Sequence, residues 1–201
     1  MDILNLLGTT LGLGLAAGLR LYATVLALGV ALRMEWLTLP SELAPLQVLA
    51  HPAVLAVAGV MYVMEFVTDK VPWLDSAWDA AHTVIRPLGA AGLALTAFGQ
   101  MDPAARVGLA LLCGGVALSS HATKAATRLA VNQSPEPVSN AGLSLLGDAA
   151  VPAFVWFTME HPVLTLVVSV VVLVVFFWIL TRIVKLLRSG WAALRRRWST
   201  A

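Results

Sequence analysis

The chain has little charge and a single cysteine. Of its 201 residues, 12% are charged and 59% are hydrophobic, and the mean hydropathy is +0.85. Soluble domains carry about 25% charged residues, so this composition excludes an ordinary soluble domain and predicts an integral membrane protein. Cys113 lies in an apolar run, cannot form an intrachain disulfide and is expected to be a small packing residue.

The sequence also lacks the motifs that identify common enzymes. It contains no P-loop, His-Glu-x-x-His, serine-nucleophile or cysteine-cluster motif. The opening "MDILNLLG" has no basic region before its apolar stretch, so a cleavable signal peptide is not expected. We expect one transmembrane helical domain at residues 1–187, followed by a basic juxtamembrane tail at residues 188–201.

The apolar runs predict an all-α integral membrane protein with about six membrane segments, some of them broken or re-entrant. A spanning helix needs about 20 apolar residues, and the candidates lie at residues 3–32, 52–68, 75–100, 103–131, 141–159 and from 162 onward. Pro87 is expected to interrupt the third candidate, giving a broken span or a re-entrant piece followed by a half helix. Similar stretches at 12–32 and 113–131 leave a 3+3 inverted repeat open.

Positive charge is concentrated near the C-terminus. A basic tail beside a membrane span indicates the cytoplasmic side and a contact with anionic lipid. Six crossings would then place both termini in the cytoplasm. Nucleic acid is not expected as a partner, because the cluster is short and close to the membrane, and a homo-oligomer is left open. The cations of the last 20 residues are Arg182, Lys185, Arg188, Arg195, Arg196 and Arg197.

The stretch "EFVTDKVPWLDSAWDAAHTVIRP", residues 65–87, gathers four carboxylates, a lysine, a histidine and an arginine. Asp75, Asp79 and His82 share one face of a short helix, because residues three or four apart are neighbours. The alternative to a functional site is a solvated interfacial helix whose charges face water. The candidate site residues in this stretch are Glu65, Asp69, Lys70, Asp75, Asp79, His82 and Arg86.

Further candidates lie in other apolar segments. His121, Lys124 and Arg128 share a face of one predicted helix. His121 and Lys124 are candidate site residues. The alternative for Lys124 and Arg128 is snorkelling to the headgroups, and for Arg128, near the helix end, it is an equal alternative. Arg20 and Asp148 are isolated charges beside glycine or proline, which favours broken helices whose ends bind ions. The alternative for both is a salt bridge that only holds the bundle together.

The stretch at 65–87, together with "SSHATKAATRLAVNQSPEPVSN" at 119–140, resembles a bacterial family of multi-pass membrane proteins known as domain of unknown function 4126. The resemblance covers nearly the whole chain and implies an inner-membrane protein. It implies no activity, substrate or cofactor. Its signature positions in this sequence are Asp69, Lys70, Asp75, Asp79, His82, Arg86, His121, Lys124, Glu136 and Asn140.

These residues favour a small membrane transporter or channel for an ion or small polar solute, with a charged intramembrane site. The acidic residues and histidines suit a cation or a coupled proton, and the basic residues suit an anion, including a lipid phosphate headgroup. One alternative is a lipid-headgroup or polyprenyl-phosphate translocase, or an enzyme whose paired carboxylates bind magnesium. Another is a membrane scaffold that transports nothing. The sequence leaves metal and cofactor undetermined, and its lack of catalytic motifs disfavours an enzyme.

Overall fold

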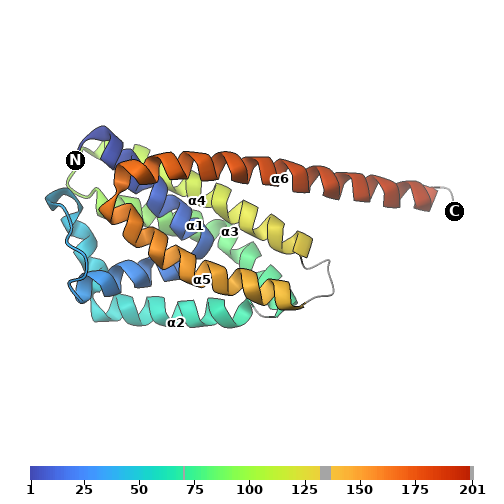
Figure 1. The fold of residues 1–201 in the computed structure, drawn as a ribbon, viewed down its shortest axis with the longest axis horizontal. Coiled ribbons are helices and arrows are strands. Elements are labelled where there is room, and N and C mark those ends of the chain that lie inside the picture. Colours follow the sequence, from blue (N-terminus) through green and yellow to red (C-terminus); the bar gives the residue numbers. More distant parts are fainter. Residues whose placement is uncertain (70, 132–136, 200–201) are drawn as a thin grey trace.

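Helices make up nearly all of residues 1–69, 71–131 and 137–199, which are the residues that the computed structural model describes. No strand occurs among them, which confirms the all-α prediction (Figure 1). Helices α2 to α6 run along the long axis of the molecule (Figure 1). The elements are α1 (Ile3–Arg33), the 3-10 helix η1 (Ser41–Ala50), α2 (Pro52–Thr68), α3 (Pro72–Ala97), α4 (Pro103–Val131), α5 (Pro137–Glu160) and α6 (Pro162–Ser199).

Proline determines where the helices of the bundle begin. Each of α2 to α6 starts with a proline, a residue favoured at the first helical position because its missing amide needs no partner there. Asp102 caps α4 by accepting a hydrogen bond from the backbone amide of Ala104 at 2.9 Å. The predicted helices at 52–68 and 103–131 are confirmed with these boundaries, whereas α5 begins at Pro137, earlier than predicted.

Helix α3 shows that the predicted break at Pro87 is wrong. The helix runs from Pro72 to Ala97 with Pro87 inside it, and Asp75, the predicted cap, lies in its first turn. Pro87 removes one backbone hydrogen bond, but α3 packs closely against α4 at this point. A Cβ atom on Gly114 would lie only 3.0 Å from the Pro87 carbonyl oxygen. Tertiary packing therefore keeps α3 continuous.

The break lies instead in α1. Arg20 has φ −152° and ψ 91°, which is extended backbone between two helical halves, residues 3–19 and 21–33. The broken helix expected around Arg20 is therefore confirmed. The one expected around Asp148 is wrong, because Asp148 lies within the continuous helix α5.

The chain reverses direction at this break. Along α5, the first half of α1 lies against Thr158, where a Cβ on Gly12 would clash. Arg20 lies against the earlier Gly147, and the second half returns toward Val155, which lines a pocket with residues 27–31. Helix α1 is thus a re-entrant hairpin whose two ends lie at the same end of the bundle (Figure 1).

Glycines allow the first half of α1 to enter the bundle. A Cβ on Gly18 would lie 1.9 Å from Ser120 Oγ and 2.3 Å from the Ala117 carbonyl oxygen of α4. A Cβ on Gly8 would lie 1.8 Å from the Pro162 carbonyl oxygen at the start of α6. Helices in lipid often pack through small residues that let their backbones approach closely.

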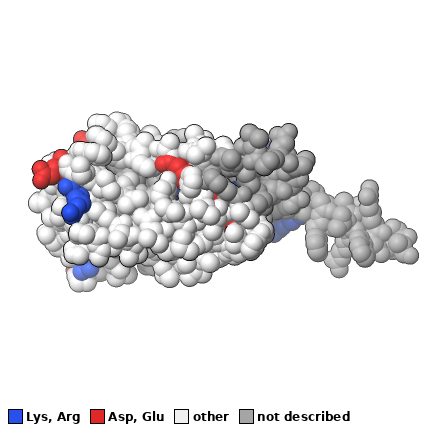
Figure 2. All heavy atoms as spheres, turned by 90° about the horizontal axis from the view of Figure 1, so that it is seen from below, with Lys and Arg blue, Asp and Glu red and all other residues white. Residues whose placement is uncertain are grey.

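Several described helices are suited to a lipid environment. Helices Ile3–Arg33, Pro103–Arg128 and Pro162–Lys185 are long and apolar enough to cross a membrane, and η1 with α2 forms a further candidate bent by 68°. Only 11% of the apolar part of α6 is buried within the protein. On the face shown in Figure 2, most of the described surface is uncharged and the charged side chains gather mainly at one end.

The reversal of α1 changes the expected topology. Helix α1 is long and apolar enough to cross a membrane, but its two ends lie at the same end of the bundle (Figure 1). Neither six crossings nor the inverted repeat is confirmed. The start of α1 and the end of α6 lie at opposite ends of the bundle (Figure 1), whereas six crossings would place them on one side.

The close packing at Gly18 predicts a stability difference between two glycines. We expect Gly18→Ala to lower the apparent melting temperature of detergent-purified protein, because overpacking costs about 1–3 kcal/mol. Gly115→Ala, in α4, is the control, because a Cβ there would meet nothing within 4 Å. Replacing an unconstrained helical glycine by alanine stabilises by roughly 0.5–1 kcal/mol. Equal melting temperatures for the two variants would contradict the close α1–α4 contact.

Candidate functional site

Charged side chains from five helices meet around the break in α1, and we call them the charged network. Among the described residues, five carboxylates face four cations, and most of these side chains are buried. The members are Arg20 (α1), Glu65 and Asp69 (α2 and its C-cap), Asp75, Asp79 and Arg86 (α3), Lys124 and Arg128 (α4), and Asp148 (α5).

Arg20 connects three helices from the tip of the α1 hairpin. Its Nη2 donates to Asp69 Oδ2 at 2.7 Å, its Nε lies 3.2 Å from Asp148 Oδ1, and its Nη1 lies 3.8 Å from Glu65 Oε1. Gly147 leaves room for the guanidinium, because a Cβ there would lie 3.1 Å from Arg20 Nε. The isolated arginine of the sequence is therefore an ion-pair partner of α2 and α5.

Glu65 contacts three cations of the network. Its Oε1 accepts from Arg86 Nη2 at 2.8 Å and from Lys124 Nζ at 3.4 Å, in addition to the contact with Arg20. The side chain is fully buried. Loss of its charge would therefore leave Arg86 and Lys124 without their nearest counter-ion, whereas Arg20 would keep its closer contacts with Asp69 and Asp148.

Two of these cations also bind the backbone at the break. Arg86 Nη1 donates to the Gly18 carbonyl oxygen at 3.2 Å, and Lys124 Nζ donates to the Leu19 carbonyl oxygen at 3.1 Å. These carbonyls belong to the last turn of the first half-helix, where the break leaves them without helical partners. The C-terminal end of a helix carries partial negative charge and favours cations, so Arg86 and Lys124 stabilise the end of the half-helix.

The two predicted histidines lie beside the network with their ring nitrogens engaged. His121 Nδ1 lies 2.6 Å from Arg86 Nη1, a donor, and its Nε2 lies 3.1 Å from the Asp79 carbonyl oxygen, an acceptor. His82 Nδ1 lies 2.8 Å from the Trp78 carbonyl oxygen, and its Nε2 lies 3.1 Å from the Tyr22 hydroxyl. These partners assign the ring proton to Nε2 of His121 and to Nδ1 of His82.

Arg128 forms part of the network, so the snorkelling alternative is wrong. Its side chain is only 5% exposed. Its Nη2 and Nη1 donate to the two carboxylate oxygens of Asp69 at 2.8 and 3.0 Å, and Nη1 also binds Asp75. A bidentate arginine–carboxylate pair is strong and directional. This pair holds the guanidinium of Arg128 inside the protein, although Arg128 lies in the last turn of α4, which ends at Val131.

Two pockets adjoin the network on either side of Arg128. One, of about 220 Å³, lies between α3 and α4 and is lined by Asp75, Asp79 and Arg128 with small residues around them. The other, of about 320 Å³, lies among α4, α5 and α6 and is lined by Arg20, Lys124, Arg128 and apolar side chains. The network is thus accessible from an acidic side and from a basic side.

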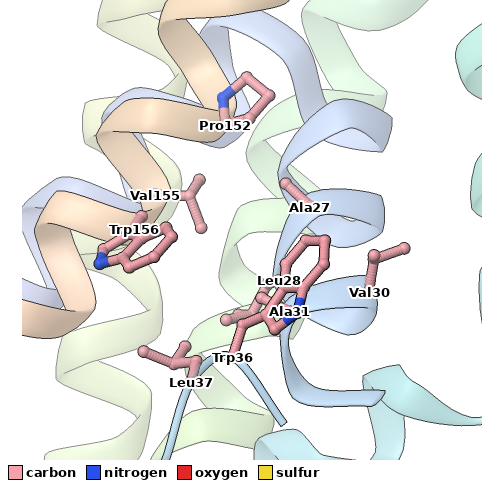
Figure 3. Close-up of a pocket in the computed structure, with 9 residues that line it drawn as sticks. All are labelled: Ala27, Leu28, Val30, Ala31, Trp36, Leu37, Pro152, Val155 and Trp156. Atoms are coloured by element: carbon pink, nitrogen blue, oxygen red, sulfur yellow. The ribbon is translucent and has the colours of Figure 1, made fainter. Parts of the chain in front are cut away.

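A third pocket, of about 190 Å³, lies far from these charges. It is formed between the second half of α1 and α5, where Leu28, Trp36 and Trp156 are among its lining residues (Figure 3). None of its lining residues is ionisable. The candidate site is therefore the charged network with its two adjoining pockets.

The structure brings together most of the predicted site residues. Glu65, Asp69 and the charges of α3 meet the cations of α4, and their role in binding a solute stays a prediction. Lys70 and Glu136 lie outside the described residues, as does the side chain of Asn140. Sequence reasoning did not include Arg128 or Tyr22 among the site residues. For Arg128 the sequence does contain a signal, because it lies four residues after Lys124 and therefore on the same helix face.

The described residues offer no obvious metal centre. Within them, no group of three or more His, Cys, Asp or Glu side chains is placed to hold a metal ion. The carboxylates are instead distributed among arginines and a lysine. The hypothesis of a magnesium-dependent enzyme therefore gains no support from this part of the chain.

Residues 7–182 match the family model described as domain of unknown function (DUF4126). The chain belongs to the DUF4126 family. All members of the charged network lie within the matched residues. No curated protein and no solved structure matches the chain, so the function of this DUF4126 protein has to be argued from its own residues.

The buried position of Glu65 among cations predicts that replacing it by the isosteric glutamine lowers the stability of the protein strongly. We expect Glu65→Gln to destabilise the protein by about 3–5 kcal/mol, because removing one partner leaves buried cations uncompensated. The measurement is the apparent melting temperature of purified protein. Glu160→Gln is the matched control, because Glu160 is exposed at the end of α5.

A double variant tests the pairing itself. Glu65→Gln combined with Arg86→Gln should destabilise by less than the sum of the two single changes, because the same contact is lost in each. Additive losses would contradict a direct interaction between Glu65 and Arg86.

Proposed function

We propose that the protein is a membrane transporter for a charged solute that binds at the charged network. The observation that carries this proposal is the position of the network at the end of a half-helix, deep in the bundle. Arg20 lies about 26 Å along α1 from its start, at 1.5 Å per residue. Discontinuous helices whose ends point at a charged site are the usual construction of substrate and ion sites in secondary transporters.

Energetics favour a functional role for these charges. Replacing a buried ion pair by apolar residues of similar volume is often neutral or stabilising, because desolvation offsets the attraction. In lipid, ionisable residues are rare and usually mark substrate or ion pathways. A scaffold with the same helices needs no network of this size, so the cost of burying it supports transport.

The two pockets favour a transporter over an open channel. Arg128 lines both of them and lies between the acidic and basic sides. A solute that competes for Arg128 or Lys124 would weaken their pairs with the carboxylates. When these cations exchange their carboxylate partners for the solute, the contacts that hold α1 and α4 change. Binding of the solute is thereby linked to a movement of α1 or α4.

We propose five crossings, α2 to α6, with α1 entering and leaving on one side of the inner membrane. The end at which α1 begins is rich in acidic residues, whereas the last part of α6 is basic. Basic residues near spans favour the cytoplasm, so the C-terminus would be cytoplasmic and the N-terminus external. The residues at the external end are Asp2, Glu35, Glu42, Asp102 and Glu160, against Arg33 and Arg106.

Exposed tryptophans at both ends of the bundle support its alignment along the membrane normal. Trp36 and Trp156 lie near the external end, and Trp73 and Trp178 lie toward the other. Trp178 is about 24 Å along α6 from its start. Tryptophan is enriched at both interfaces of a hydrocarbon core that is about 30 Å thick.

Transport is tested with purified protein in liposomes. We expect a current or leaflet transfer above that of empty vesicles for at least one member of a panel. The panel contains sodium, potassium, magnesium, chloride, phosphate, acetate and a fluorescent phosphatidic acid. Leaflet transfer of the fluorescent lipid is measured by dithionite quenching. Lys124→Gln should abolish the signal, because this cation lies at both the break and the basic pocket.

Lys185→Gln is the matched control, because Lys185 is exposed on α6 and outside the network. It should retain the wild-type signal. A wild type that moves no member of the panel, or a Lys124→Gln variant with full activity, would contradict the proposed function.

A further inference from the structure

The basic pocket is lined by two chemically different groups of residues. One group is polar and contains Arg20, Lys124 and Arg128 with the hydroxyl-bearing Thr123 and Thr127. The other group is apolar and consists of Leu19, Leu146, Gly147, Ala150, Phe176 and Ile179. Among the described residues no carboxylate lines this pocket, and those of the network pair with its cations. Such a pocket is suited to an anion that carries an apolar chain.

Part of the pocket lining lies on the exposed surface of the bundle. Leu146 is 66% exposed, and most of the described apolar part of α6 is exposed as well. Phe176 lies about 21 Å along α6 from the external end, and Ile179 lies further along. In a hydrocarbon core about 30 Å thick, this depth is close to the headgroups of the proposed cytoplasmic leaflet.

The size of the pocket restricts the headgroup. A volume of about 320 Å³ corresponds to roughly ten water molecules at 30 Å³ each. It accepts a phosphate and the first atoms of a chain, while the rest of the chain stays in the bilayer. A choline or ethanolamine headgroup would place its own cation against three cations, which disfavours zwitterionic lipids. Arginine and lysine are the usual partners of phosphate.

We propose that the basic pocket binds a lipid phosphate with a small anionic headgroup, which enters from the bilayer between α4, α5 and α6. The phosphate lies against Lys124, Arg20 and Arg128, and the chain lies along Phe176 and Ile179. This inference rests on the proposed function in that it names the charged solute of the same network. Binding would draw Lys124 and Arg128 away from their carboxylate partners.

Binding is tested with the full chain, purified in detergent. The probes are dioleoyl phosphatidic acid, dioleoyl phosphatidylethanolamine with the same chains, and inorganic phosphate. We expect phosphatidic acid alone to raise the apparent melting temperature, with an effect that saturates with concentration. An equal rise with phosphatidylethanolamine would show non-specific apolar binding, and an equal rise with inorganic phosphate would show a free-anion site. Either result overturns the proposal.

Pocket-filling variants locate the site without removing a charge. Ala150→Trp should weaken binding of phosphatidic acid about tenfold or more, which corresponds to about 1.4 kcal/mol. Its neighbour Ala149→Trp is the control, because Ala149 is exposed on α5 but does not line the pocket. Ile179→Trp fills the pocket from α6 and keeps the test valid if the α5 variant fails to fold. Equal affinity in the wild type and the pocket-filling variants would overturn the proposal.

The experiments can reject the lipid site and the transport function independently of each other. Specific binding of phosphatidic acid, lost on filling the pocket, supports the lipid site even when vesicles show no leaflet transfer, and that combination rejects transport alone. Flux of a soluble ion without any lipid binding supports transport and overturns the lipid site.

Discussion

The structure depends on how the broken end of α1 is stabilised inside the bundle. A helix that stops within a membrane exposes backbone carbonyls that no water can satisfy. Arg86 and Lys124 donate to the carbonyls of Gly18 and Leu19, so in this protein cations satisfy the broken end. Those cations need counter-ions, and Glu65 accepts from both of them. The remaining ion pairs extend outward from this core of contacts.

This dependence explains why charged residues occur on each of the five helices α1 to α5. Arg20 stands at the break itself and binds Asp69 and Asp148, and Asp69 in turn holds Arg128. Five carboxylates and four cations leave the network without exact charge balance among the described residues. A network that is nearly neutral tolerates burial, because each charge has a nearby counter-ion.

Parts of the fold and site could be predicted from sequence, because their causes are local. The prolines at which α2 and α4 begin, and the lengths of the apolar runs that follow, predicted the bounds of these helices. The charge of Arg20 among glycines predicted a broken helix. The reversal of α1 could not be predicted, because an extended residue in a long apolar run has no distinct composition. The break predicted at Pro87 was wrong because packing of α3 against α4, which is distant in sequence, keeps the helix continuous. Arg128 was ambiguous because its bidentate partner, Asp69, is distant in sequence.

The most direct test of this account is the sidedness of the two ends of α1. Single cysteines are placed at Leu4, Trp36 and Arg188 in a Cys113→Ala background, and intact cells are treated with a membrane-impermeant maleimide. Leu4 and Trp36 are exposed at the two ends of α1, and Arg188 lies late in α6. The account predicts labelling of the first two from outside and of Arg188 only after permeabilisation. Labelling of Leu4 and Trp36 from opposite sides would show that α1 crosses the membrane, and would contradict a charged site at the tip of a re-entrant helix.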